Sequence, residues 1–448
     1  RSRFGRARRR SVTHAATDPM SGAPASDDER DPSTGTDRHG SAVGVDAPDR
    51  GERLWLVLVG CLAAYLPFTL LGYGTDIDVP NVLRSGRSWL EDGRYELSRK
   101  PGAVVHEIPT AVLDRIGGSV LVNMASVGFA LLAIWSVYRL VRSDGSPWPG
   151  WASLAMAANP WFWMAATSLG DFVWALGLVL GGALAASRDR RLLAGVMFGL
   201  ALGCRSSSAL VVAAWLLAER TGKSDQRVPW SATLRTAAVA GVVGLLCFVP
   251  PWLQADRTLQ FLDSGLGFEG FGINAGRWAV KNAAVIGIPA GIVMIIGIPR
   301  ILGAVARWNV SVVVRFALMT MVVSELLFFR LPLKPVHLLP VVAAVALMAG
   351  ASPRVSRGLL IALVGAQLLG GVVGTTIGAP DVAHEATTGR LDVGLTAGPL
   401  LNMVQCRLDD RELGPWPDPT DGPEQAERAA RRGEHNFDCE SETWRVTP

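Results

Sequence analysis

The stretch LWLVLVGCLAAYLPFTLL, residues 54–71, is followed closely by Thr75-Asp76-Ile77-Asp78. An apolar run of this length can cross a hydrocarbon core about 30 Å thick. Similar runs recur along a chain in which 49% of the residues are hydrophobic. The pattern predicts an all-α fold, a polytopic transmembrane bundle of about 11 helices. The expected helices cover residues 53–72, 119–141, 148–168, 171–187, 191–204, 206–219, 234–252, 279–300, 311–329, 335–350 and 358–377.

Basic residues predict the orientation of this bundle, because cytoplasmic loops retain Lys and Arg during insertion. Alternate loops are basic, starting with the arginine-rich segment Arg1 to Arg10. We therefore expect a cytoplasmic N-terminus, and place loops 73–117 and 254–278, segment 330–337 and the C-terminal tail outside. The net charge of +4 does not indicate nucleic acid, since the basic residues form no stripe with interleaved aromatics.

Three parts of the chain are expected. Residues 1–50, rich in polar residues, Gly and Pro, should be a disordered cytoplasmic segment. Residues 51–378 should form the transmembrane domain that carries the candidate site, and residues 379–448 a short extracytoplasmic tail. Cys406 and Cys439 both fall in this tail, where an oxidising exterior favours a disulfide between them.

The first outer loop, residues 73–117, is too long for a simple connector. Its apolar residues fall at helical spacing, which predicts two short interfacial helices lying on the membrane lipids. Asp76 and Asp78 begin this loop, and as carboxylates at neutral pH they can take a proton from an attacking hydroxyl. Two carboxylates one residue apart also suit a divalent cation. The alternative is a solvated turn behind a helix.

Cationic groups follow in the same loop. Ser98-Arg99-Lys100-Pro101-Gly102 offers the planar fork of Arg99 and the mobile charge of Lys100 to a phosphate, unless both are ordinary surface charge. Glu107 comes a few residues later. Lysine occurs at only four positions, and three of them, Lys100, Lys281 and Lys334, map to the outer side. This bias suggests that an ammonium is needed there.

Four further candidates gather on the outer side. Asp171 lies in a tight turn, where it is either a helix N-cap or a site residue. Arg205, at the tip of an apolar hairpin, is costly unless it is paired or faces water. Lys334 and His337 lie in Arg-Leu-Pro-Leu-Lys-Pro-Val-His, residues 330–337, where His337 alone would more often be a structural hydrogen-bonding residue.

Taken in order, these motifs resemble those of the GT-C class of polytopic glycosyltransferases, which includes protein O-mannosyltransferases and aminoarabinose transferases acting on lipid A. The resemblance spans about residues 53 to 350. It rests on the acidic pair after the first helix, the cationic loop followed by Glu107, Asn159-Pro160 leading to Asp171, and the hairpin 192–210. Residues 331–340 look like the late motif in which such enzymes hold the lipid phosphate.

The resemblance implies transfer of a sugar, with inversion, from a polyprenyl-phosphate donor to an envelope glycan, lipid or protein on the outer face. Asp76 or Asp78 would be the general base. The implied substrate-binding residues are Arg99, Lys100, Glu107, Asp171, Arg205, Lys334 and His337. Only Asp171 stands where some relatives carry paired acids, so no metal site is assigned and the need for a divalent cation stays open. The competing interpretation is a lipid-linked sugar flippase or transporter, although such proteins place ionisable residues near the bilayer midplane.

Overall fold

A computed structural model describes residues 54–74, 76, 78–222, 227–262, 270–305, 310–378, 392–412, 427, 428 and 431. All of these belong to one unit, Arg50–Pro448. The predicted N-terminal segment, residues 1–50, lies outside the described residues. So does most of the predicted tail, residues 379–448, apart from one strand, one helix and a few further positions.

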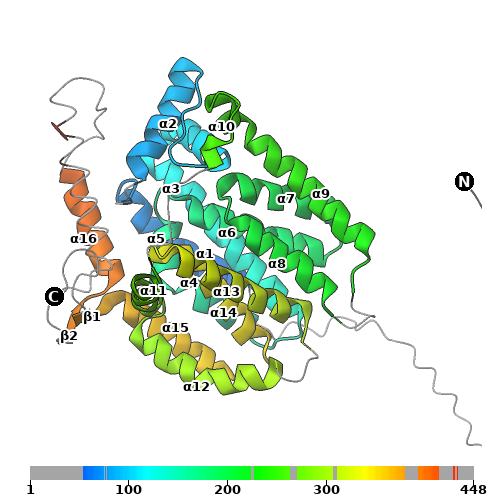
Figure 1. Cartoon of the computed structure of the whole chain (residues 1–448). Helices are drawn as coiled ribbons and strands as arrows, with labels where there is room; N and C mark the ends of the chain where they lie inside the picture. The colour runs from blue at the N-terminus through cyan, green and yellow to red at the C-terminus, as the bar shows by residue number, and fades with distance from the viewer. Residues whose placement is uncertain are drawn as a thin grey trace, which may run out of the picture. The chain divides into compact units, whose positions relative to one another are not determined.

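The prediction of an all-α fold is confirmed, since the described elements are helices apart from one small hairpin (Figure 1). In this hairpin, β1 (Val373–Gly378) pairs antiparallel with β2 (Asp392–Ala397). The α-helices are α1 (Leu54–Tyr65), α2 (Val79–Asp92), α3 (Val104–Ser143), α4 (Pro149–Ala157), α5 (Pro160–Ala166), α6 (Asp171–Ser187), α7 (Arg191–Cys204), α8 (Ser208–Arg220), α9 (Trp230–Cys247), α10 (Val249–Gln254), α11 (Phe271–Ile286), α12 (Ile288–Val305), α13 (Val312–Arg330), α14 (Leu339–Ala351), α15 (Arg357–Val372) and α16 (Pro399–Glu412). The 3₁₀ helices are η1 (Leu66–Leu70), η3 (Gln260–Leu262) and η4 (Pro335–Leu338).

Several of these helices are long enough to span a membrane. Within the described ranges, three helices, α3, α13 and the combined α9–α10, are long and apolar enough to cross a bilayer. Two bent pairs, α5 with α6 and α11 with α12, raise this number to five if each pair forms one span. The other apolar helices, such as α1 with η1, are shorter, and several are extended by a 3₁₀ turn.

Breaks within the predicted helices have local causes. The predicted helix 279–300 is in fact two helices, α11 and α12, bent by 92° at Gly287, which has a left-handed φ of 73°. Residues 148–168 also divide, because Pro160 disfavours helical backbone at Asn159. Asn159 instead caps α5, accepting from the backbone N–H groups of Trp161 and Phe162. The predicted helix 358–377 ends early, at Val372, where the chain becomes extended.

The predicted interfacial helices of the first outer loop are present. α2 buries Val79, Val82, Leu83 and Gly86, which recur at helical spacing on one face. The second is the start of α3, which is separated from the rest of that helix by non-helical backbone at Gly117 and Gly118. The cationic loop connects these two helices, so their packing positions it.

The core forms around α6, in which all residues from Asp171 to Ala186 are buried. It packs on α3 and α7, and α7 packs in turn on α9. Small residues allow these helices to approach closely, as is common in membranes. A Cβ at Gly177 of α6 would lie only 2.5 Å from the carbonyl oxygen of Phe129 in α3. The N-terminus of this central helix, at Asp171, is therefore fixed by its surroundings.

Candidate active site

The acidic segment behind η1 forms a tight local structure. The backbone N–H of Asp78 donates to Asp76 Oδ1 at 2.8 Å. Asp78 then begins α2 as its N-cap residue, but its side chain makes no capping hydrogen bond. Both carboxylates are about one quarter exposed. They remain available for contacts with other elements, and an isolated solvated turn does not describe them.

Lys334 bridges the two carboxylates from the far end of the sequence. Its Nζ lies 2.7 Å from Asp76 Oδ1 and 3.3 Å from Asp78 Oδ2. Lys334 belongs to the short connection between α13 and η4, which α11 supports: Lys281 Nζ donates to the carbonyl oxygens of Pro332 and Leu333. Two of the lysines that the sequence analysis singled out thus have structural roles, an ion pair at Lys334 and a brace at Lys281.

Arg99 connects the acidic segment to the start of α6. Its Nη1 lies 3.1 Å from Asp78 Oδ2, and its Nη2 pairs with Asp171 Oδ2. Asp171 is the first residue of α6, and the N-cap position before it is occupied by Gly170. Its side chain is fully buried and receives a second cation, Arg205 Nη1, at 2.8 Å from Oδ1. Of the two interpretations of Asp171, the structure therefore rejects the helix cap.

Arg205 extends the network to His337. Arg205 follows the last residue of α7, and its Nη2 lies 3.4 Å from His337 Nδ1. A guanidinium has no acceptor, so His337 accepts through Nδ1. Phe172 packs against both: the Arg205 guanidinium lies 3.8 Å from its ring centroid, and the His337 ring meets its edge. Phe172 had no signal in the sequence beyond following Asp171.

Seven predicted site residues thus form one continuous charge cluster: Asp76, Asp78, Arg99, Asp171, Arg205, Lys334 and His337. Three carboxylates are balanced by three cations. Burial raises the pKa of Asp78, but Lys334 and Arg99 lower it by more, so the pKa lies below its ordinary value. Asp76, Asp78, Arg99, Lys334 and Arg205 each keep part of their side chain exposed, whereas Asp171 is enclosed. A ligand would therefore meet these five residues, and Asp171 would hold the two arginines.

Glu107 and Lys100 differ from these seven residues. The Glu107 carboxylate is buried and accepts from Tyr95 Oη, Ser98 Oγ and the backbone N–H of Ala103. Burial raises the pKa of Tyr95, which keeps the phenol a neutral donor. Glu107 therefore braces the loop that carries Arg99. Lys100 is exposed, and the structure places it in no ion pair with the described part of the chain.

The helix arrangement matches solved structures of ArnT from Cupriavidus metallidurans. The apo structure aligns with a TM-score of 0.52 at 16% sequence identity, and the structure bound to undecaprenyl phosphate with 0.51 at 18%. Both alignments cover 87% of this chain and 76% of the ArnT chain. The chain has the GT-C fold of ArnT. Comparisons with family models and with curated proteins find no match.

With this GT-C fold and its apolar helices, the chain is a multi-pass membrane protein. The described part of the chain contains no group of three or more His, Cys, Asp or Glu side chains placed to hold a metal ion. Between Asp76 and Asp78, where a cation would bridge two carboxylates, lies the ammonium of Lys334.

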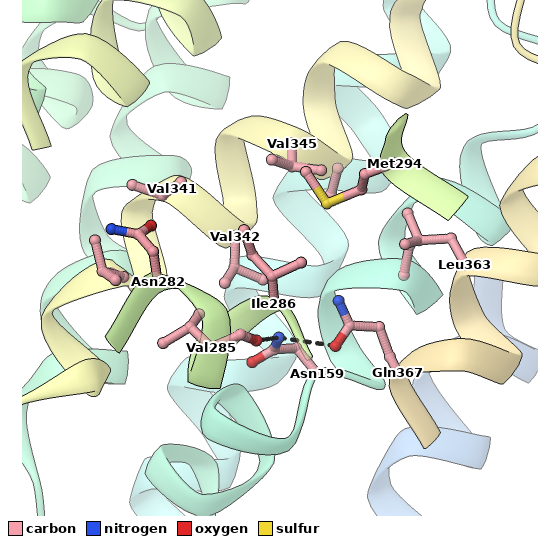
Figure 2. A pocket seen from close by; sticks show the side chains of 13 residues that line it. Asn159, Asn282, Val285, Ile286, Met294, Val341, Val342, Val345, Leu363 and Gln367 are labelled. Atoms are coloured by element: carbon pink, nitrogen blue, oxygen red, sulfur yellow. Dashed lines mark hydrogen bonds between the residues drawn. The ribbon is translucent and has the colours of Figure 1, made fainter. Parts of the chain in front are cut away.

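A mostly apolar pocket is lined in part by a residue adjacent in sequence to the charge cluster. It is lined by α4, α11, α12, α14 and α15, and Leu338, which follows His337, is among its residues. Figure 2 shows Asn159 within it, donating to the carbonyl oxygen of Val285 and to Gln367 Oε1 at 2.9 Å each. Asn159, which the sequence places in a family motif, therefore ties α5 to α11 and α15.

Proposed function

We propose that this protein is a membrane glycosyltransferase that moves a sugar from a polyprenyl-phosphate donor to an envelope acceptor on the extracytoplasmic face. The observation that carries the proposal is the partly exposed portion of the charge cluster: three cations beside two carboxylates in a GT-C fold. The ArnT structure with undecaprenyl phosphate supports a lipid phosphate as the ligand. The proposed partners also include membrane lipids, and no nucleic acid.

The proposed roles follow from exposure and charge. Asp76 or Asp78 takes the proton of the acceptor hydroxyl as general base. Arg99 and Lys334 bind the donor phosphate and stabilise it as the leaving group, a kind of charge stabilisation worth about 3 kcal/mol for one well-placed donor. Arg205 offers a third cation to the phosphate, Asp171 and His337 orient the charged groups, and Lys100 reaches the phosphate from the exposed loop. Without a separate nucleophile, attack inverts the anomeric centre.

The cations have a second effect on the base. Lys334 and Arg99 hold Asp78 in its ionised form and so weaken it as a proton acceptor. A donor phosphate competes for both cations, which loosens their hold on Asp78 and raises its affinity for a proton. The base is therefore strongest when the donor is bound. This favours a sequence in which the lipid donor binds before proton transfer from the acceptor.

The proposed orientation places the N-terminus in the cytoplasm and the C-terminus outside. The charge cluster joins the N-terminal end of α6, the C-terminal end of α7 and the connection after α13, which all meet at one end of the bundle. The basic loops at the other end favour the cytoplasm. Residues 51–378 are then the catalytic membrane domain, with residues 1–50 inside and residues 379–448 outside.

The test uses purified protein in nanodiscs, a radiolabelled polyprenyl-phosphate sugar and candidate envelope acceptors. We expect release of polyprenyl phosphate coupled to labelling of the acceptor, with and without a chelator to decide the need for a divalent cation. A parallel assay in sealed vesicles follows movement of the lipid-linked sugar across the bilayer. If the lipid-linked sugar crosses the bilayer but is not transferred to any acceptor, the protein is a flippase and the enzyme proposal is rejected.

A further inference from the structure

A helix near the C-terminus brings an arginine into the interior of the bundle. α16 runs beside α5 and α15 (Figure 1) and buries Leu400, Met403, Cys406 and Arg407. Arg407 is only 1% exposed and is one of the largest fully buried side chains. A buried guanidinium is costly unless its donors are satisfied. Its hydrogen-bond partners therefore indicate what Arg407 does.

Two of the hydrogen-bond partners of Arg407 are carbonyl groups of separate elements. Its Nη1 donates to the carbonyl oxygen of Phe68 in η1 at 3.1 Å and to that of Thr167, just after α5, at 2.9 Å. The planar fork of arginine holds several donors in fixed positions, whereas lysine carries a single point charge on a flexible stem. Arg407 therefore fastens η1 to the turn between α5 and α6.

These two elements lead directly to the carboxylates of the cluster. η1 precedes Asp76, and the turn after Thr167 precedes Asp171. The two backbones are joined again where the N–H of Leu169 donates to the carbonyl oxygen of Tyr73 at 2.7 Å.

Gly74, between η1 and Asp76, lies close to both the α5–α6 turn and α16. A Cβ at this position would lie 2.7 Å from Ser168 Cβ and 3.3 Å from Arg407 Nη2. Gly74 thus lies against both the α5–α6 turn and α16. A change in any one of these three parts would move the acidic segment relative to Asp171.

We propose that Arg407 is a positioning residue, which fixes the segment carrying Asp76 and Asp78 against the turn carrying Asp171. Cys406, its neighbour in α16, is buried and disulfide-bonded. The C-terminal segment is then part of the scaffold of the active site. This inference rests on the proposed function for its catalytic consequence, but its structural consequence is independent of that function.

The experiment compares Arg407→Met, which keeps the length of the side chain without its donors, with Gln405→Met at an exposed position of the same helix. Hydrogen exchange is measured in nanodiscs, together with kcat and KM for sugar transfer. We expect faster exchange in Arg407→Met, confined to residues 66–79 and 166–172. We also expect kcat to fall by about 100-fold, since small displacements of catalytic groups have effects of this size. Arg407→Lys should recover part of both, and Gln405→Met should match the wild type.

Wild-type exchange and turnover in Arg407→Met would overturn the proposal, and so would faster exchange spread over all helices. If Arg407→Met does not fold, Arg407→Lys carries the test with the same local pattern at smaller size. If exchange in Arg407→Met is faster only in these two segments but the wild type transfers no sugar, Arg407 anchors the two segments and the glycosyltransferase proposal is rejected. If exchange is faster only in these segments but kcat is unchanged, the positioning role is rejected.

Discussion

At the scale of single residues, Asp78 has the most informative surroundings. It is about one quarter exposed, and its Oδ2 lies 3.1 Å from Arg99 Nη1 and 3.3 Å from Lys334 Nζ. Asp76 shares Lys334 and accepts the backbone N–H of Asp78. The two carboxylates are therefore not equivalent, because Asp78 contacts both cations whereas Asp76 contacts one.

The first prediction concerns these carboxylates. Asp78→Asn and Asp76→Asn keep the shape of the side chain but remove the base, and loss of a general base lowers the rate by about 100- to 10,000-fold. We expect this loss in kcat for at least one of them, with binding of the lipid donor retained. Glu91→Gln, an exposed acid on α2, is the control. Wild-type rates in both variants and in the double variant would move the base elsewhere, most simply to Asp171 or Glu107.

The second prediction is a pH dependence. The base works when ionised, so kcat/KM should decline as the pH falls through the pKa of Asp78. Lys334 and Arg99 hold this pKa below its ordinary value. Lys334→Met removes one of these charges, raises the pKa and should move the acidic limb of the pH profile to higher pH, in addition to weakening donor binding. Arg94→Met, at an exposed position of the loop that carries Arg99, should leave the limb in place. An unmoved limb in Lys334→Met would contradict the assignment.

At the scale of elements, the cluster is a product of helix ends. Asp78 begins α2, Asp171 begins α6, Arg205 follows α7, and Lys334 precedes η4. Each side chain is placed by the packing of its helix. The exception is Arg99, which lies in the connection between α2 and α3 and relies on the brace that Glu107 forms with Tyr95 and Ser98.

The third prediction belongs to the junction between η1 and the α5–α6 turn. Gly74 has a left-handed φ of 100°, and a Cβ there would overlap Ser168. Gly74→Ala should therefore lower the free energy of unfolding by about 1 to 3 kcal/mol and reduce transfer. Gly93→Ala is the matched control, since Gly93 also has a positive φ but has open space around its Cβ position. The measurements are thermal unfolding and sugar transfer. Equal stability and equal transfer in Gly74→Ala and Gly93→Ala would show that close contact at Gly74 is not important.

At the scale of the whole molecule, the fourth prediction is the orientation in the membrane. We expect a cysteine at position 40 to react with an impermeant maleimide only after permeabilisation, and one at position 418 to react in intact cells. Labelling at position 40 in intact cells, or no labelling at position 418, would contradict the proposed orientation.

The predicted partner of Cys406 is Cys439, which lies outside the described residues. Peptide mapping without reduction tests whether the two are linked.

The sequence by itself determined the helical class, the membrane character and the approximate positions of most helices, but not the breaks within residues 148–168 and 279–300. These depend on runs of neighbouring apolar residues, which local composition displays directly. It also named the seven residues of the charge cluster, because polar groups at the ends of apolar runs stand out. The assignment of catalytic and binding roles stays a prediction, as do the boundaries of the three parts of the chain.

The tertiary structure decided which of these residues meet. Lys334 and Asp76 are 258 residues apart, and no periodicity relates them. Asp171 could be a cap or a site residue until Arg99 and Arg205 were found on its two oxygens. The burial of Arg407 likewise depends on neighbours from distant elements. Contacts between distant segments arise from packing of the whole bundle, whereas hydropathy reports only which residues leave water.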